Sequence, residues 1–456
     1  MNMGTTSASS PLVPPPASAD HPVWLRVGTL LDGTSTVPIR NAHIVYDATE
    51  ILFVGAVDRT PPRELLRDGQ IAPDVDAPDA TLLPGLIEAH AHLFLEGGEL
   101  DAEKRAGYLK QDPAALLAAA RERLEKLVRL GVTAVRDAGD KDGVGLALSK
   151  LYRSASVVAG VADPGPASTR PATSPARLLI PYVESPGAAI HHRGRYGGFM
   201  GGALEDFPSL RACVEARVAA GADRIKLIPT GIINFKQGAV TTEPQMTTEE
   251  IRELVAAAKS FGRQTFAHAS GDAGIERVIG GGVDSVEHGF FVRDDQLARM
   301  RDRQTAWVPT FAPVQAQVDH ATIVGWDERI VANLRDILDR HAASLVKAQA
   351  LGVLIVAGSD AGSYGVAHGV GFLRELELME RAGLPALAVI NAATGTGANR
   401  LAYREKFGRI APGWQSRFIL TRHSPLETVA NLRRPGIVIF DGEPYESGAN
   451  PDVQGL

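Results

Sequence analysis

The stretch that decides the fold is residues 83–92, LPGLIEAHAH. An apolar run leads into His90 and His92, and side chains two residues apart on a β-strand point to the same face. Two imidazoles on one face can bind one metal ion, although two hydrogen-bonded core histidines would give the same pattern. The stretch therefore predicts a buried strand with a candidate metal site at its carboxyl end.

Seven further apolar runs follow along the chain, and they alternate with segments of helical periodicity such as 113–130 and 247–261. This alternation is typical of a parallel sheet with helical crossovers. The eight runs end near His92, Asp137, Val183, Pro229, His268, His288, Thr310 and Asp360. Eight strands with their crossovers favour an α/β fold in which residues 83–404 close into a (β/α)8 TIM barrel.

Short strand-like runs bounded by turn residues flank this region on both sides, in residues 22–82 and 405–445. We expect these two terminal segments to pair into a small composite β-sandwich domain. Residues 1–20 are rich in Ser, Pro and Ala and predict a disordered N-terminal tail, and residues 161–175 predict a long loop. The glycine-rich residues 184–202 form a candidate substrate loop, although their glycines can also serve only to turn a surface loop.

Composition narrows the class of partner. The 456 residues carry a formal net charge of -6 and contain no basic block, which argues against nucleic acid and an anionic membrane as partners. No run has the apolar length of a signal peptide or a membrane span, so we expect a cytoplasmic protein with a small-molecule substrate. We also expect a homo-oligomer. The single cysteine, Cys213, is interpreted as a core residue.

Four further residues that can bind metal lie at the ends of predicted strands: Lys226, His268, His288 and Asp360. Lys226 stands in a buried apolar run, where its ammonium needs a carboxylate partner or a route to the surface. Alternatively, burial lowers its pKa and the free amine takes up carbon dioxide, which gives a carbamate that can bridge two cations. Asp360 can bind metal and exchange a proton, or it can cap the next helix.

Together with residues 131–137 (GVTAVRD) and 357–360 (AGSD), these positions resemble the amidohydrolase superfamily, in its prolidase-like and imidazolonepropionase-related branch. The resemblance covers roughly residues 27–442. It implies two divalent cations, with zinc as the first expectation and manganese or cobalt as alternatives. It implies that one cation binds His90, His92 and Asp360, that the other binds His268 and His288, and that N-carboxylated Lys226 bridges them.

The same resemblance implies a metal-dependent hydrolase that cleaves an amide or peptide bond by attack of a metal-bridging hydroxide, with Asp360 as the catalytic residue that moves the proton. We expect a dipeptide or an N-acyl amino acid-like substrate that bears a carboxylate. The predicted substrate-binding residues are His191, His192, Tyr196, Tyr364 and His368. Arg193 and Arg195 are either further contacts or ordinary surface charges.

Three alternatives remain open at this point. A lactonase or phosphotriesterase would use the same binuclear site. A deaminase is less favoured, because Gly271 stands where such enzymes place a glutamate and because Lys226 would have no role. A non-catalytic barrel scaffold would have lost metal ligands, whereas all six are present. Residues 191–198 (HHRGRYGG) differ from the Gly-Gly-His element of relatives, so this loop need not bind the same substrate.

Overall fold

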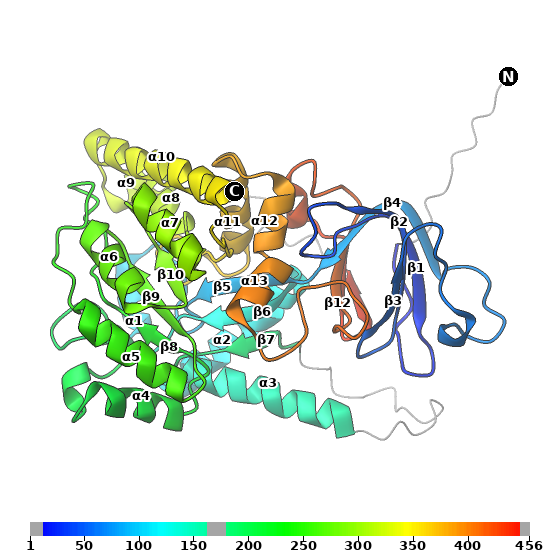
Figure 1. Ribbon diagram of the computed structural model, residues 1–456, viewed down its shortest axis with the longest axis horizontal. Helices are drawn as coiled ribbons and strands as arrows, with labels where there is room; N and C mark the ends of the chain where they lie inside the picture. The colour runs from blue at the N-terminus through cyan, green and yellow to red at the C-terminus, as the bar shows by residue number, and fades with distance from the viewer. Residues whose placement is uncertain (1–11, 162–178, 447–456) are drawn as a thin grey trace.

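The computed structural model describes residues 12–161 and 179–446 and shows a mixed α/β fold (Figure 1). Its parallel strands form a three-stranded sheet in the order β5-β6-β7 and a four-stranded sheet in the order β11-β10-β9-β8. The strands are β5 (Leu86–Ala91), β6 (Val132–Asp137), β7 (Tyr182–Glu184), β8 (Ile225–Leu227), β9 (Thr265–Ala269), β10 (Ser285–His288) and β11 (Ala306–Val308). Seven of the eight predicted runs are therefore strands.

Single backbone bridges extend these two sheets toward each other at both edges. They pair Ile190 with Leu227, Trp307 with Ile355, and Ala91 with Ala361. The eighth predicted run, residues 354–360, is thus not a regular strand. Its backbone bridges β11 near one end and β5 near the other, and it turns at Asp360, which has a φ of 59°. The closed eight-stranded barrel stays a prediction.

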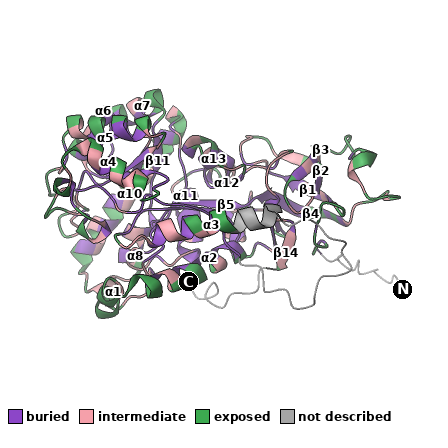
Figure 2. Ribbon diagram, turned by 90° about the horizontal axis from the view of Figure 1, so that it is seen from below, coloured by how far each residue is buried: buried purple, intermediate pink, exposed green. Residues whose placement is uncertain are grey.

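Helices cover the parallel strands, with exposed residues on their outer faces and buried residues beneath them (Figure 2). Both helices expected at 113–130 and 247–261 are confirmed to within one residue, because the sequence supplies their caps. Asp112 accepts two backbone N–H bonds ahead of a proline, and Thr247 forms a capping box with Glu250. None of the described helices is long and apolar enough to cross a membrane.

The helices follow the strands in chain order. They are α1 (Ala102–Tyr108), α2 (Pro113–Arg129), α3 (Val144–Val161), α4 (Leu210–Ala219), α5 (Thr248–Ser260), α6 (Asp272–Gly281), α7 (Asp294–Arg303), α8 (Ala312–Asp319), α9 (Ala321–Val324), α10 (Glu328–Leu351), α11 (Val370–Arg381), α12 (Ala386–Ala392) and α13 (Gly395–Leu401). Short 3-10 turns lie at Arg63–Leu65, Gly198–Met200, Leu204–Asp206 and Val429–Arg433.

A seven-stranded sheet lies at the other end of the molecule and contains strands from both terminal regions (Figure 1). Its order is β14-β13-β12-β4-β1-β2-β3. The strands are β1 (Val23–Leu30), β2 (Ile39–Tyr46), β3 (Ile51–Gly55), β4 (Val75–Pro84), β12 (Arg417–Thr421), β13 (Ile437–Phe440) and β14 (Glu443–Glu446). The predicted pairing of the two ends is present, through β4 and β12. The β-sandwich and the exact domain limits stay predictions.

Three local expectations have different outcomes. The predicted tail is shorter than residues 1–20, because Leu12 and Ala17 are buried in the core of the terminal sheet. Residues 1–11 lie outside the described residues, and so does nearly all of the loop predicted at 161–175. Cys213 is buried in the main core, in agreement with its interpretation as a core residue.

Candidate metal centre and substrate cavity

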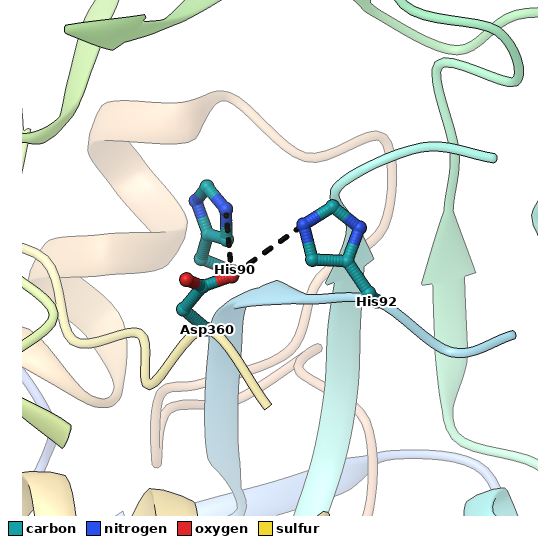
Figure 3. Close-up of side chains that lie close together, drawn as sticks. All are labelled: His90, His92 and Asp360. Atoms are coloured by element: carbon teal, nitrogen blue, oxygen red, sulfur yellow. Dashed lines mark ion pairs between the residues drawn. The ribbon is translucent and has the colours of Figure 1, made fainter. Parts of the chain in front are cut away.

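His90, His92 and Asp360 converge where β5 ends (Figure 3). The Oδ1 atom of Asp360 lies 3.6 Å from Nε2 of His90 and 3.4 Å from Nε2 of His92. These donor atoms all lie within 4.8 Å of one another, and the buried Nε2 of His90 has no hydrogen-bond partner among the described residues. Two imidazoles and a carboxylate form a donor set that suits a divalent cation such as zinc.

The outward-facing nitrogens of these histidines are set by bonds on the other side of each ring. Nδ1 of His90 lies 2.6 Å from Oε2 of Glu287, which also accepts a 2.7 Å bond from Arg136. Nδ1 of His92 lies 3.2 Å from the carbonyl oxygen of Gly139. Both partners are acceptors, so each Nδ1 carries the proton and each Nε2 keeps a free lone pair. Bonds of this kind orient metal-binding histidines.

His268 and His288 lie beside this cluster. Their ring centroids are 4.5 Å apart, and the His288 ring is 5.1 Å from that of His90. Nδ1 of His288 lies 2.8 Å from Oγ1 of Thr310, which fixes its ring. Nε2 of His268 lies 3.3 Å from the carbonyl oxygen of Gly231. The structure thus brings all four predicted histidines together, while the three-ligand cluster found among the described residues contains only His90, His92 and Asp360.

Three strand-end residues at this site have left-handed backbones. The φ angles are 66° at His288, 52° at Thr310 and 59° at Asp360. Non-glycine residues rarely adopt this conformation, and it persists where the surrounding structure holds it, often at functional sites. Trp307 donates from Nε1 to the carbonyl oxygen of His288 at 2.8 Å, which is one such constraint. The turns therefore place the side chains by rigid packing.

Lys226 is 2% exposed on β8, with its Nζ 4.6 Å from the centroid of the Phe266 ring. Burial lowers its pKa to about 8, assisted by Arg136 and opposed by Glu287. A lowered pKa increases the fraction of neutral amine, which is the form that reacts with carbon dioxide.

Burial also sets the charge of the other predicted ligands. It lowers the pKa of His92 and that of His268 to about 3, so both imidazoles are neutral and able to bind metal at neutral pH. Burial raises the pKa of Asp360 to about 7, and a hydrogen bond from Ser363 opposes that rise. The site therefore has little charge of its own before cations bind.

A cavity of about 420 Å³ opens above these side chains. Two of the predicted substrate-binding residues, Tyr196 and Tyr364, line it, and the ring of Tyr196 lies 5.3 Å from that of His268. The rest of the wall is mainly apolar. It includes Leu95, Leu109, Phe199, Met200, Ile232, Ile233, Phe235, Phe290, Pro313 and Val314.

Three predicted substrate contacts need correction, because His191, His192 and His368 are not among the residues that line the cavity. Both ring nitrogens of His191 face backbone carbonyl oxygens, at 3.0 and 2.9 Å. His192 lies between Glu205, at 2.7 Å, and Glu250, at 3.3 Å. Nε2 of His368 lies 3.1 Å from the carbonyl oxygen of His92, behind the ligand it was expected to accompany.

The two arginines of the same loop are surface charges and also do not line the cavity. Arg193 pairs with Asp206, and Arg195 donates to the carbonyl oxygen of Glu243 at 2.5 Å. Sequence reasoning identified a charged loop after the third strand but not the partners that occupy its side chains.

The sequence analysis also missed two features of the site. The Glu287 and Arg136 pair is buried, with side chains 0% and 1% exposed, and a charged residue inside each of two apolar runs was the available signal. Arg105, from the short helix α1, lines the cavity. No sequence signal distinguished it from the solvent-exposed charges that surround it.

Comparisons with known proteins agree with this geometry. The model of the amidohydrolase family matches residues 81–443. Ochratoxinase from Aspergillus niger is 26% identical over 418 residues, which cover 90% of this chain and 83% of that protein. Imidazolonepropionase from Aromatoleum aromaticum is 31% identical over 149 residues, 28% of this chain and 34% of that protein. The crystal structure of a Xaa-Pro dipeptidase with bound methionine in the active site is 25% identical, with a TM-score of 0.72 over 93% of this chain and 100% of that one.

Proposed function

The chain belongs to the amidohydrolase family and is a hydrolase that acts on carbon–nitrogen bonds, and we propose that it cleaves an amide or peptide bond of a dipeptide or N-acyl amino acid-like substrate with the help of two divalent cations. The observation that carries the proposal is the convergence of His90, His92, His268, His288, Lys226 and Asp360 at the floor of one cavity.

The first cation would be held by His90, His92 and Asp360. The buried Nε2 of His90 supports this, because an unpartnered buried nitrogen is costly unless a ligand satisfies it. His268 and His288 would hold the second cation, with carboxylated Lys226 between the two. Support comes from the ring contact of the two histidines and from the buried, partly neutral amine. Zinc is the proposed metal.

Bound cations would polarise the scissile carbonyl and acidify a water molecule. The chain's own residues then position and protonate. Oδ2 of Asp360 accepts a 2.8 Å bond from Ser363, which leaves Oδ1 facing the two histidines. This carboxyl would carry a proton to the leaving nitrogen. Tyr196, beside His268, would orient the substrate, and the apolar wall would exclude bulk water.

The two relatives with the widest coverage support the substrate class. One is named ochratoxinase and the other Xaa-Pro dipeptidase, and the latter structure has methionine in its active site. A cavity of about 420 Å³ can hold an amino acid joined to a second group of moderate size. The backbone bridges at both edges of the parallel sheets support the closed barrel as the scaffold.

A substrate panel assayed with metal-loaded enzyme tests the proposal. The panel contains N-acyl amino acids, Xaa-Pro and other dipeptides, aryl amides, lactones and phosphotriesters. We expect the highest kcat/KM among the amides and dipeptides, with activity lost after chelation and recovered when metal is restored. Faster turnover of lactones or phosphotriesters than of any amide would contradict the assignment, and so would full activity in metal-free enzyme. The His92→Ala variant is the matched inactive control.

A further inference from the structure

Arg105 brings a permanent positive charge to the cavity wall. It lies on α1, is partly buried, and lines the same cavity as the predicted metal ligands. Its guanidinium carbon lies 5.5 Å from the centroid of the Tyr364 ring. The other cationic side chain in the lining, Lys226, would lose its charge on carboxylation. Arg105 would then be the one fixed cation among the described lining residues.

The hydrogen bonds that Arg105 donates within the described residues go to backbone carbonyl oxygens. One nitrogen donates to Glu96 at 2.6 Å and to Glu99 at 3.4 Å, and the other donates to Gly362 at 3.1 Å. The carboxylate of Glu96 is instead paired with Arg123, at 3.2 Å, and that of Glu99 with Lys104, at 3.6 Å. Carbonyl oxygens fix the position of a guanidinium without neutralising its charge, so an anionic ligand would gain a full ion pair.

The position of Arg105 is tied to the metal centre through Gly362. This glycine follows Asp360 by two residues and has a φ of 100°, and a Cβ placed on it would lie 2.8 Å from the carbonyl oxygen of His92. Only glycine suits this close approach. The carbonyl that anchors Arg105 therefore belongs to the turn that carries Asp360, and the guanidinium borders the reaction site.

Large apolar side chains that also line the cavity are exposed to solvent. Ile232 is 52% exposed and Leu109 is 37% exposed. Phe235 and Phe199 line the same wall. Exposed apolar side chains that border a cavity mark a surface that an apolar ligand group can cover.

We propose that Arg105 binds the carboxylate of the substrate and that the wall containing Leu109, Ile232 and Phe235 receives a bulky aliphatic or aromatic group on the other side of the scissile amide. The substrate class is thus an N-acyl amino acid or dipeptide with a free carboxylate and a large apolar acyl part. This inference rests on the proposed function for the bond that is cleaved, and on Arg105 for the carboxylate.

Matched probes test the carboxylate directly. N-(2-naphthoyl)-phenylalanine is compared with its primary carboxamide, and N-acetyl-phenylalanine tests the apolar group. In the wild-type enzyme we expect kcat/KM for the acid to exceed that for the carboxamide by about 10- to 100-fold, the range of a charge-assisted hydrogen bond. Arg105→Gln should remove most of this ratio by lowering turnover of the acid alone, and Arg105→Lys should keep part of it. Arg193→Gln, an exposed arginine with an acidic partner, is the control.

Binding measurements separate this inference from the proposed function. The naphthylsulfonyl analogues of the acid and the carboxamide cannot be cleaved at the amide, and their Kd values are measured by calorimetry with metal-loaded protein. Tighter binding of the acid that Arg105→Gln abolishes supports the site even if no amide is hydrolysed, in which case only the proposed function fails. Equal binding of the two analogues to the wild type overturns the role of Arg105, whatever the activity. An acetyl substrate turned over as fast as the naphthoyl one overturns the apolar wall.

Discussion

Nδ1 of His90 lies 2.6 Å from Oε2 of Glu287, in a fully buried contact between β5 and β10. The same carboxylate oxygen accepts from Arg136, and the other carboxylate oxygen accepts a 2.6 Å bond from Ser285. Glu287 therefore stays ionised and acts as an acceptor, which directs Nε2 of His90 toward Asp360. The orientation of the predicted metal ligand thus depends on a residue that would not touch the metal.

Glu287→Gln tests this dependence. The amide is close in size but is a weaker acceptor, so we expect affinity for the more tightly bound cation to fall about 10- to 100-fold, the usual cost of losing such a partner. Metal affinity is measured by competition with a chelator, and circular dichroism checks the fold because Arg136 loses its partner. Glu276→Gln, on the surface of α6, is the control. An unchanged affinity in folded Glu287→Gln protein would rule out the positioning role.

Metal content tests the second cation site. Reconstituted wild-type enzyme should contain close to two divalent cations per chain. His268→Ala and His288→Ala should each lose one cation and most of the activity, because an absent ligand opens the coordination sphere. Elemental analysis provides the count. One cation in the wild type, or two retained in both variants, would restrict the centre to His90, His92 and Asp360.

The loop after β7 yields opposite predictions for two of its residues. Tyr196 lines the cavity, so Tyr196→Phe should change kcat/KM by several-fold and alter the order of preferred substrates. His192 is held between Glu205 and Glu250 outside the cavity, so His192→Gln should leave the kinetic constants unchanged and only lower Tm slightly. Steady-state kinetics on the same substrates compare both. Changed specificity in His192→Gln would restore it as a substrate contact.

A buried histidine away from the metal centre gives a pH dependence with a defined sign. Burial lowers the pKa of His341 to about 4, while its bond to the carbonyl of Pro309 opposes the shift. The unfolded chain binds a proton near pH 6.5 and the folded chain does not, so this residue reduces stability as pH falls from 6.5 toward 4. The loss is about 2 kcal/mol at pH 5.

His341→Phe should therefore show a smaller loss of unfolding free energy between pH 7 and pH 5 than the wild type. Phenylalanine keeps the ring that stacks on Phe290 at 4.0 Å. Urea unfolding at both pH values measures the difference, and His423→Phe at an exposed position is the control. An identical pH dependence in the wild type and His341→Phe would show that His341 does not titrate as its burial requires.

Much of the metal centre could be predicted from the sequence because its ligands follow a simple rule. His90, Lys226, His268 and His288 each stand at the end of a short apolar run, and parallel strands bring such ends together. Asp360 was predicted at the end of a strand, but its segment makes only single bridges and turns at the aspartate. The rule worked there because the position of the residue depends on the bridges rather than on a regular ladder.

The substrate contacts were less predictable, because a side chain's direction depends on partners far away in the sequence. His191 and His192 share a loop with Tyr196, yet only Tyr196 reaches the cavity. Glu250, which captures His192, is 58 residues away. Arg105 lies in a helix whose sequence is typical of a solvated surface, and only its bond to Gly362 brings it to the site.

Lys226 tests the binuclear centre itself. Its proposed carbamate supplies a bridging anion between two cations that would otherwise repel each other, so Lys226→Ala should lose two-metal occupancy and activity while the chain stays folded. A short carboxylic acid such as acetate should partly restore both, because it can occupy the vacated position. Full activity in Lys226→Ala protein would show that no bridge from this residue is needed.

The most direct measurement is a crystal structure of the metal-loaded protein with anomalous diffraction at the metal edge. The account predicts two anomalous peaks, one beside His90, His92 and Asp360 and one beside His268 and His288, with electron density extending beyond Nζ of Lys226 as a carboxylate that contacts both. Density that ends at an unmodified amine more than about 3 Å from any cation, well beyond a metal–oxygen bond, or a single anomalous peak, would contradict it.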